Sequence, residues 1–140
     1  MVEETWNRDV VALALADPRF YHLDTAFCPL PGGEVVYFPP AFTQSAQRAI
    51  QARLAPSQRI EIEAADACRL AANAVCIGNT IVMSACSPDL RARLEERGYR
   101  ILVTPLGAFA RSGGAAFCLT LRLDLRSDPA GAMLSDAEVA

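Results

Sequence analysis

The sequence contains no lysine. All 13 of its basic residues are arginine, and with 16 acidic residues they give the 140-residue chain a formal charge of −3. The sequence has no basic run and an isoelectric point near 5.1. It therefore lacks the clustered positive charge by which nucleic-acid-binding proteins bind phosphates. Its longest apolar runs, such as residues 10–16 and 81–85, are far shorter than the roughly 20 residues that cross a bilayer, and no basic segment precedes an apolar one at the N-terminus. We therefore expect a cytoplasmic protein with neither a nucleic-acid nor a membrane partner.

The sequence also lacks any CxxC pair, although it contains five cysteines. They are Cys28, Cys68, Cys76, Cys86 and Cys118. An odd, scattered set argues against a disulfide framework and a structural zinc site, and it suits a reducing compartment. One metal site stays open as an alternative, formed by Cys28, His22 and Asp24. The main expectation is that the protein uses neither a metal nor a cofactor.

A short motif occurs three times along the chain. It reads AFC at residues 26–28, AVC at 74–76 and AFC at 116–118, each inside an apolar run typical of a strand. With 52% apolar residues, the chain is long enough for one hydrophobic core and too short for two. The repeated motif therefore predicts modules inside one domain.

The residues between the copies predict one order of elements in each module: strand, strand, helix, strand. In the second module, Ser87, Pro88 and Asp89 form a helix start, and Gly98 ends the helix. The first module has a helix from about residue 43 to 54, and its strands are β-branched or aromatic runs. We also expect a strand at residues 10–16, and a third module that begins with one strand in residues 112–123.

The single histidine, His22, lies two residues before Asp24. On a strand, residues two apart face the same side at about 7 Å, so this pair could share a pocket. His22 could equally be a satisfied surface or core histidine. Cys118 follows Gly113 and Gly114, where backbone can approach a ligand closely, whereas Cys28 and Cys76 lack such glycines and are interpreted as core residues.

Three segments carry a resemblance to a known family: DPRFYHLDTAFCPL, ANAVCIGNTIVMS and SGGAAFCLTLRL. They resemble the C-terminal half of the guanidine-modifying penteins, the group of amidinotransferases, arginine deiminases and dimethylarginine dimethylaminohydrolases. The resemblance implies an α/β fold, a partial αβ-propeller with about half of five strand-strand-helix-strand modules. Residues 1–126 would be the C-terminal half of the catalytic domain, and residues 127–140 a polar tail.

The same resemblance implies roles for individual residues. Cys118 would be the nucleophile, His22 the general acid/base, and Asp24 the carboxylate that binds a guanidinium substrate. Asn73 would hold backbone by hydrogen bonds, with direct contact to a ligand as the alternative. Arg111, judged from its residue type alone, is interpreted as a solvated arginine, with contact to a substrate carboxylate as the alternative.

Family members take further acidic residues from the N-terminal half, and no position here matches them. The partner would therefore be a copy of this chain or a complementary N-terminal chain. The function expected is that of half an amidino-group hydrolase or amidinotransferase, and the alternative is a non-catalytic assembly module.

Overall fold

The computed structural model describes residues 9–121 and 123. The chain divides into two compact units, residues 13–120 and a second unit formed by residues 1–12 and 121–140. The polar tail expected at residues 127–140 lies outside the described residues. All described helices and strands lie in the unit 13–120.

The described elements alternate between short strands and helices. In chain order they are the 3-10 helix η1 (Leu23–Thr25), β1 (Phe27–Pro29), β2 (Val35–Tyr37), η2 (Pro39–Ala41), α2 (Gln44–Arg53), η3 (Pro56–Gln58), β3 (Arg59–Glu61), α3 (Ala64–Ala67), β4 (Val75–Ile77), β5 (Thr80–Met83), α4 (Pro88–Glu95), β6 (Arg100–Val103) and α5 (Gly107–Ala110). The mixed α/β class predicted from the sequence is confirmed.

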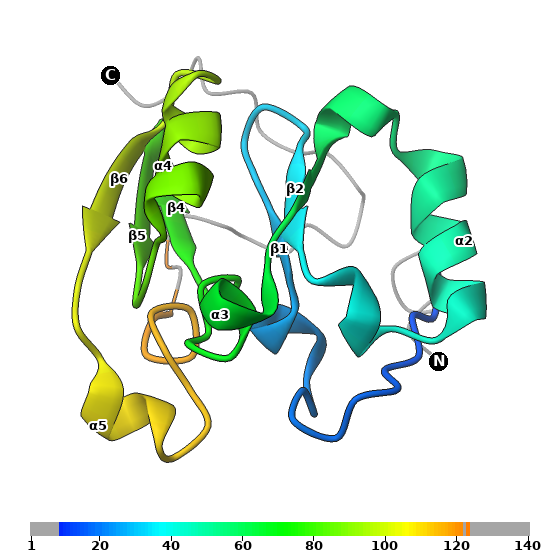
Figure 1. Cartoon of the computed structure of the whole chain (residues 1–140), viewed down its shortest axis with the longest axis horizontal. Coiled ribbons are helices and arrows are strands. Elements are labelled where there is room, and N and C mark those ends of the chain that lie inside the picture. The colour runs from blue at the N-terminus through cyan, green and yellow to red at the C-terminus, as the bar shows by residue number, and fades with distance from the viewer. Residues whose placement is uncertain (1–8, 122, 124–140) are drawn as a thin grey trace. The chain divides into compact units, whose positions relative to one another are not determined.

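Two modules with the same topology form this unit (Figure 1). In the first, β1 pairs antiparallel with β2, and β2 pairs parallel with β3 across the connection that contains α2. In the second, β4 pairs antiparallel with β5, and β5 pairs parallel with β6 across α4. The predicted order of strand, strand, helix, strand is therefore correct for both modules.

Local sequence signals explain where α4 begins. The Ser87 side chain accepts a hydrogen bond from the Leu90 amide at 3.2 Å, which caps the helix. Leu90 and Leu94, one turn apart, are both completely buried. After the helix, Gly98 has φ +86, a left-handed conformation that favours glycine. These predicted start and stop signals are confirmed.

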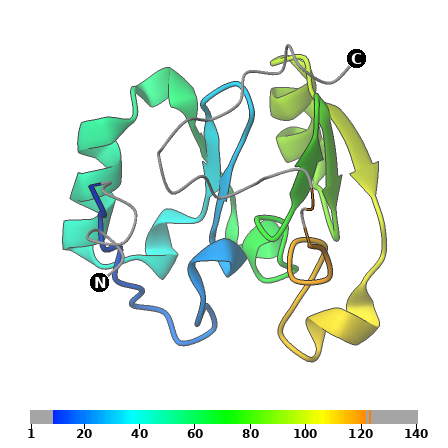
Figure 2. The ribbon, with the colours of Figure 1, turned by 180° about the vertical axis from the view of Figure 1, so that it is seen from behind.

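The two modules share one core. Strand residues of both sheets belong to a single cluster of buried apolar side chains, and the sheets can be seen from behind in Figure 2. Polar contacts also join the modules: Tyr99 donates to a Glu34 carboxylate oxygen at 2.7 Å and accepts from the Gly32 amide at 2.9 Å. The modules therefore pack as one body instead of two independent domains.

Two expected strands are wrong. Residues 10–16 contain an isolated antiparallel bridge between Leu15 and Phe42 in place of a strand. Its two backbone hydrogen bonds run from the Thr43 amide to the Ala14 carbonyl and from the Ala16 amide to the Ala41 carbonyl. Residues 116–119 form a turn. Here the Asn73 side chain accepts hydrogen bonds from the amides of Ala115 and Cys118, which a strand would use for pairing.

The short helices α3 and α5 were not predicted. Within the described residues, no helix is long and apolar enough to span a membrane.

The Ser87→Ala variant should lose both a helix cap and a partner of a buried carboxylate. Ser87 donates its hydroxyl to Asp66 at 2.6 Å, and Asp66 is only 3% exposed. We expect the free energy of unfolding to fall by about 2 to 4 kcal/mol, from loss of the cap and of a charge-assisted bond. Urea unfolding measures this. Ser57→Ala, at an exposed serine, is the control, and equal stability of the two variants would contradict the assignment.

Candidate functional site

The segment that carries His22 and Asp24 is a 3-10 turn and not the expected strand. Leu23–Thr25 forms η1, with His22 as its extended N-cap. Thr25 closes the turn, because both its amide (3.1 Å) and its hydroxyl (2.6 Å) donate to the His22 carbonyl. The prediction that His22 and Asp24 face one side of a strand is therefore wrong.

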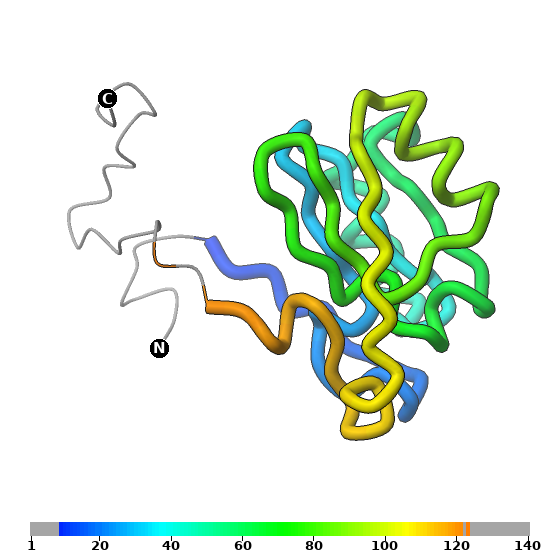
Figure 3. The backbone as a smooth tube through the Cα atoms, turned by 90° about the vertical axis from the view of Figure 1, so that its left-hand side faces the viewer, coloured from blue at the N-terminus to red at the C-terminus, as the bar shows by residue number. Residues whose placement is uncertain are grey.

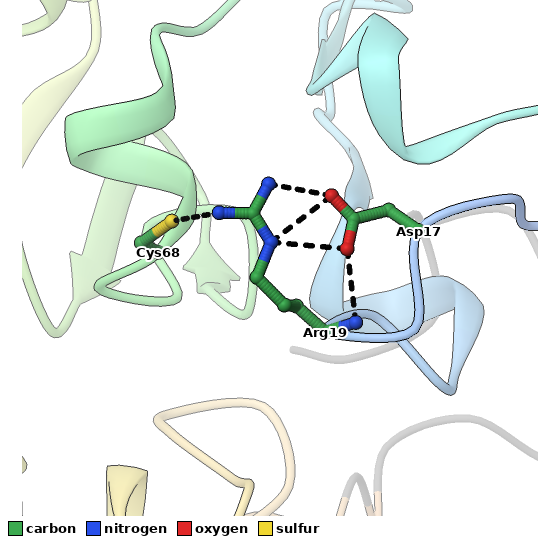
Figure 4. A network of polar contacts seen from close by, with 3 residues as sticks. All are labelled: Asp17, Arg19 and Cys68. Carbon is green, nitrogen blue, oxygen red and sulfur yellow. Dashed lines mark hydrogen bonds and ion pairs between the residues drawn. The ribbon is translucent and has the colours of Figure 1, made fainter.

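A small polar network fixes the chain just before this turn (Figure 4). The Arg19 Nε donates to both carboxylate oxygens of Asp17 at 3.0 Å, and Arg19 Nη1 donates to the Cys68 sulfur at 3.2 Å. The hydrogen bonds from Arg19 hold the pKa of Asp17 below its usual value, and Asp17 raises the pKa of the Arg19 guanidinium. Because Cys68 caps the C-terminus of α3, the network ties the approach to His22 to the body of the unit.

Asn73 lies at the centre of the site and is completely buried. Its amide nitrogen donates to the Asp24 carboxylate at 3.0 Å, to the Asp24 carbonyl at 3.1 Å and to the Cys118 sulfur at 3.2 Å. Its side-chain oxygen accepts from the amides of Ala115 at 2.9 Å and Cys118 at 3.2 Å. The predicted role of Asn73, holding backbone, agrees with these bonds, and its contact with the sulfur was not foreseen.

These bonds bring Cys118 and Asp24 together from opposite ends of the unit. The Cys118 thiol donates to Asp24 Oδ2 at 3.2 Å. Cys118 is exposed and Asp24 is half-buried. Figure 3 shows the loop that carries Cys118, drawn in orange, beside the blue segment that leads to Asp24. A nucleophilic atom and a carboxylate therefore share one solvent-accessible place.

His22 is exposed and lies beside the ring of Tyr21, at a centroid distance of 4.9 Å and an interplanar angle of 64°. Among the described residues, the His22 imidazole makes no hydrogen bond to Asp24 or Cys118. The structure thus joins Asp24 to Cys118 directly and leaves His22 on the neighbouring surface.

The two glycines before Cys118 are required for different reasons. Gly113 has φ +90, and a Cβ there would also collide with the Tyr21 hydroxyl. A Cβ on Gly114 would lie 2.9 Å from the Cβ of Cys118 itself. The glycine pair therefore lets the backbone fold tightly around the cysteine. Tyr21, whose hydroxyl donates to the Gly113 carbonyl, is a residue that the sequence reasoning missed, although it adjoins His22 in the motif.

The other cysteines differ from Cys118 in their surroundings. A hydrogen bond with Cys76 and burial both raise the pKa of the Cys28 thiol, and burial raises the pKa of Cys86 to about 11. Cys28 is buried, and Cys76 is half-buried and packs against the core, as their interpretation as core residues requires. No group of three His, Cys, Asp or Glu side chains in the described part of the chain could hold a metal ion. Arg111 is exposed.

Comparison with known proteins finds several relatives, although no family model matches the chain. It is 49% identical over 117 residues to the bifunctional arginine dihydrolase/ornithine cyclodeaminase ArgZ of Synechocystis, covering 84% of this chain and 17% of that protein. It is 38% identical over 114 residues to the N(G),N(G)-dimethylarginine dimethylaminohydrolase of Mycobacterium tuberculosis, covering 81% of this chain and 37% of that enzyme.

Solved structures resemble the fold closely. The N-terminal domain of ArgZ, crystallised as a cysteine-to-serine variant bound to its substrate, superimposes with a TM-score of 0.85 at 45% identity, over 86% of this chain and 45% of that domain. Unliganded AgrE superimposes with a TM-score of 0.77 at 47% identity, over 79% of this chain and 16% of that chain. The chain thus spans less than half the length of the relatives that it matches.

Replacing Asn73 by aspartate keeps the shape of the side chain but puts a carboxylate against Asp24 and removes the amide donor. We expect Asn73→Asp to lower the free energy of unfolding by about 3 to 5 kcal/mol at pH 7, the usual cost of a buried charge without a partner. Repulsion between the two carboxylates raises their pKa in the folded state only, so stability should recover as the pH falls from 7 to 4 and one of them is protonated. Urea unfolding at both pH values measures the effect.

The matched control is Asn79→Asp, because Asn79 is exposed in a turn and donates only a long hydrogen bond of 3.4 Å to Gly98. A loss of stability at Asn73 no larger than at Asn79 would show that the site does not depend on this amide.

Proposed function

Because the homologues of this chain are arginine dihydrolases and a dimethylarginine dimethylaminohydrolase, members of the pentein superfamily, we propose that it forms the C-terminal half of an amidino-group hydrolase or amidinotransferase that acts on arginine-like guanidino substrates. The observation that carries the proposal is the contact of the Cys118 sulfur with Asp24 at 3.2 Å. A thiol beside a carboxylate supplies both a nucleophile for an amidine carbon and an anion for its positive charge.

Asp24 binds the substrate in this proposal. Its carboxylate accepts N–H groups of the planar guanidinium in charge-assisted bonds. The cation then takes the place of the thiol hydrogen at Asp24 and favours the thiolate form of Cys118, and the thiol proton passes to the His22 imidazole. Substrate binding and activation of the nucleophile are therefore one event.

Cys118 and His22 carry the chemistry. The thiolate attacks the guanidinium carbon and forms an S–C bond, the C–N bond breaks, and the departing amine takes a proton from His22. In the second step His22 removes a proton from water, which attacks the same carbon, and the S–C bond breaks to release the thiolate. An amine in place of water would make the reaction a transfer. Hydrolysis is favoured, because the named relatives are hydrolases.

The remaining modules come from outside this chain. Two complete modules are described, and the chain covers 45% of the matched ArgZ domain. We interpret residues 1–126 as about half of a five-module αβ-propeller. The outer strand β6 exposes Leu102 at 45% and Val103 at 40%, and Phe117 beside Cys118 is 49% exposed. Such apolar surface is typical of an interface, and it fits a complementary N-terminal chain or a copy of this chain.

The proposed setting is the cytoplasm, where thiols stay reduced, since all five cysteines are free. The proposal includes neither metal nor cofactor. The rival function is a non-catalytic assembly module that keeps the fold without turnover, and the next two experiments separate it from the enzyme.

Chloroacetamidine, an amidine with a halide leaving group, should alkylate Cys118 before the other four cysteines. Peptide mass spectrometry after short exposures measures the order. Cys68 is a stringent internal reference because it is also exposed, and its sulfur accepts a hydrogen bond from Arg19 whereas the Cys118 sulfur donates to a carboxylate. Cys118→Ser should abolish the fast labelling without loss of fold. Equal rates at Cys68 and Cys118 would favour the assembly module.

The chain alone should not hydrolyse arginine or methylated arginines, because within residues 9–121 Asp24 is the one carboxylate that contacts Cys118. Coexpression with the part of the Synechocystis ArgZ domain that the chain does not match should produce a stable complex with activity. In that complex, His22→Ala should lower kcat about 10²- to 10⁴-fold, whereas Asp24→Asn should chiefly raise KM. Light scattering measures formation of the complex, and an assay for citrulline and ornithine measures its activity. A monomer that turns over arginine unaided would refute the half-propeller.

A further inference from the structure

Tyr21 contacts His22 and the loop that leads to Cys118. Its hydroxyl donates to the Gly113 carbonyl, in the loop that leads to Cys118. Its ring lies edge-on to the His22 imidazole, with centroids 4.9 Å apart. The side chain is 55% exposed, so burial in the core does not explain its place. One surface tyrosine therefore joins two segments that are 92 residues apart.

The loop before Cys118 is held by local backbone bonds, by Asn73 and by Tyr21. The amides of Gly113 and Gly114 donate to the carbonyls of Ala110 at 3.0 Å and Phe109 at 3.3 Å. Helix α5, which precedes Gly113, has no buried residue. On the far side of Gly113, the Asn73 side chain holds the Ala115 amide at 2.9 Å. The space above Gly113 is filled by the tyrosine, because a Cβ there would lie 1.7 Å from the Tyr21 hydroxyl oxygen. Tyr21 therefore ties Gly113 to the segment that carries His22, which the local backbone bonds of the loop do not do.

The orientation of the His22 imidazole also depends on Tyr21. Among the described residues, the contact found for the His22 ring is the Tyr21 ring, and Thr25 bonds only to the His22 backbone. An edge-to-face contact between rings restricts their relative orientation. The tyrosine ring therefore limits where the exposed imidazole can point.

We propose that Tyr21 is a positioning residue that holds the His22 imidazole within reach of the Cys118 sulfur. The inference rests on the proposed function, in which these two groups act on one substrate carbon. The hydroxyl bonds the loop that leads to the cysteine, the ring contacts the imidazole, and the rigid aromatic ring keeps these two contacts at a fixed separation. Tyr21 itself neither binds the substrate nor moves a proton.

The test is the pH dependence of Cys118 alkylation by chloroacetamidine in the full chain. The unmodified protein should show an inflection contributed by His22, identified by its loss in His22→Ala. Tyr21→Phe keeps the ring and removes the hydroxyl, so it should slow the alkylation of Cys118 by about two- to tenfold, the worth of one hydrogen bond, and should flatten the inflection. The rate at Cys68 should not change.

A spectroscopic measurement makes the test independent of rate. His22 is the only histidine, so its imidazole C2–H gives one resolvable NMR signal. Alkylation of Cys118 should shift that signal in the unmodified chain and shift it less in Tyr21→Phe. Tyr99→Phe is the matched control, since it also removes a tyrosine hydroxyl that bonds a glycine backbone, at Gly32, away from the site.

The outcomes separate the two proposals. If Tyr21→Phe and Tyr99→Phe gave the same alkylation rates and the same His22 signal while Cys118 was still labelled selectively, that result would overturn the role of Tyr21 and leave the proposed function standing. A slower reaction at Cys68 and Cys118 together would also overturn it, since that change would report general loosening of the fold. Absence of selective labelling in the unmodified chain would instead overturn the proposed function.

Discussion

One buried amide holds the candidate site together. Asn73 is completely enclosed, and burying a primary amide is costly unless its donors and acceptor are satisfied. Its partners come from the turn at Asp24 and from the loop at Ala115 and Cys118, segments that are far apart in the chain. The arrangement of the carboxylate and the sulfur is therefore a consequence of packing, because neither segment can move without leaving a polar group unpaired in the interior.

The sequence predicts the scaffold better than it predicts the site. The modules follow from local signals that act within a few residues, such as the cap at Ser87 and the β-branched or aromatic runs in the strands. The two errors near the site, the turns at residues 23–25 and 116–119, have the opposite origin. Both contain apolar residues typical of strands, but side chains of Thr25 and Asn73 bind the backbone that a strand would use.

The candidate residues were found through their motifs, and their contact was not predictable from spacing. Cys118 and Asp24 are 94 residues apart, and no local periodicity encodes that meeting. Tyr21 was missed because a tyrosine beside a histidine carries no pattern of its own. The candidate site residues His22, Asp24 and Cys118 lie on turns and loops, while the strands supply core residues. This division allows the site and the scaffold to change separately.

The contact between Cys28 and Cys76 has a consequence for how such a protein can evolve. The two residues hold equivalent positions in the two modules, one in β1 and the other in β4, and the Cys76 thiol is close enough to raise the pKa of the Cys28 thiol. The same position of the two modules thus meets its counterpart in the interior. Enlarging the residue at this position in both modules would crowd one point of the core twice, so small, adaptable side chains are favoured there.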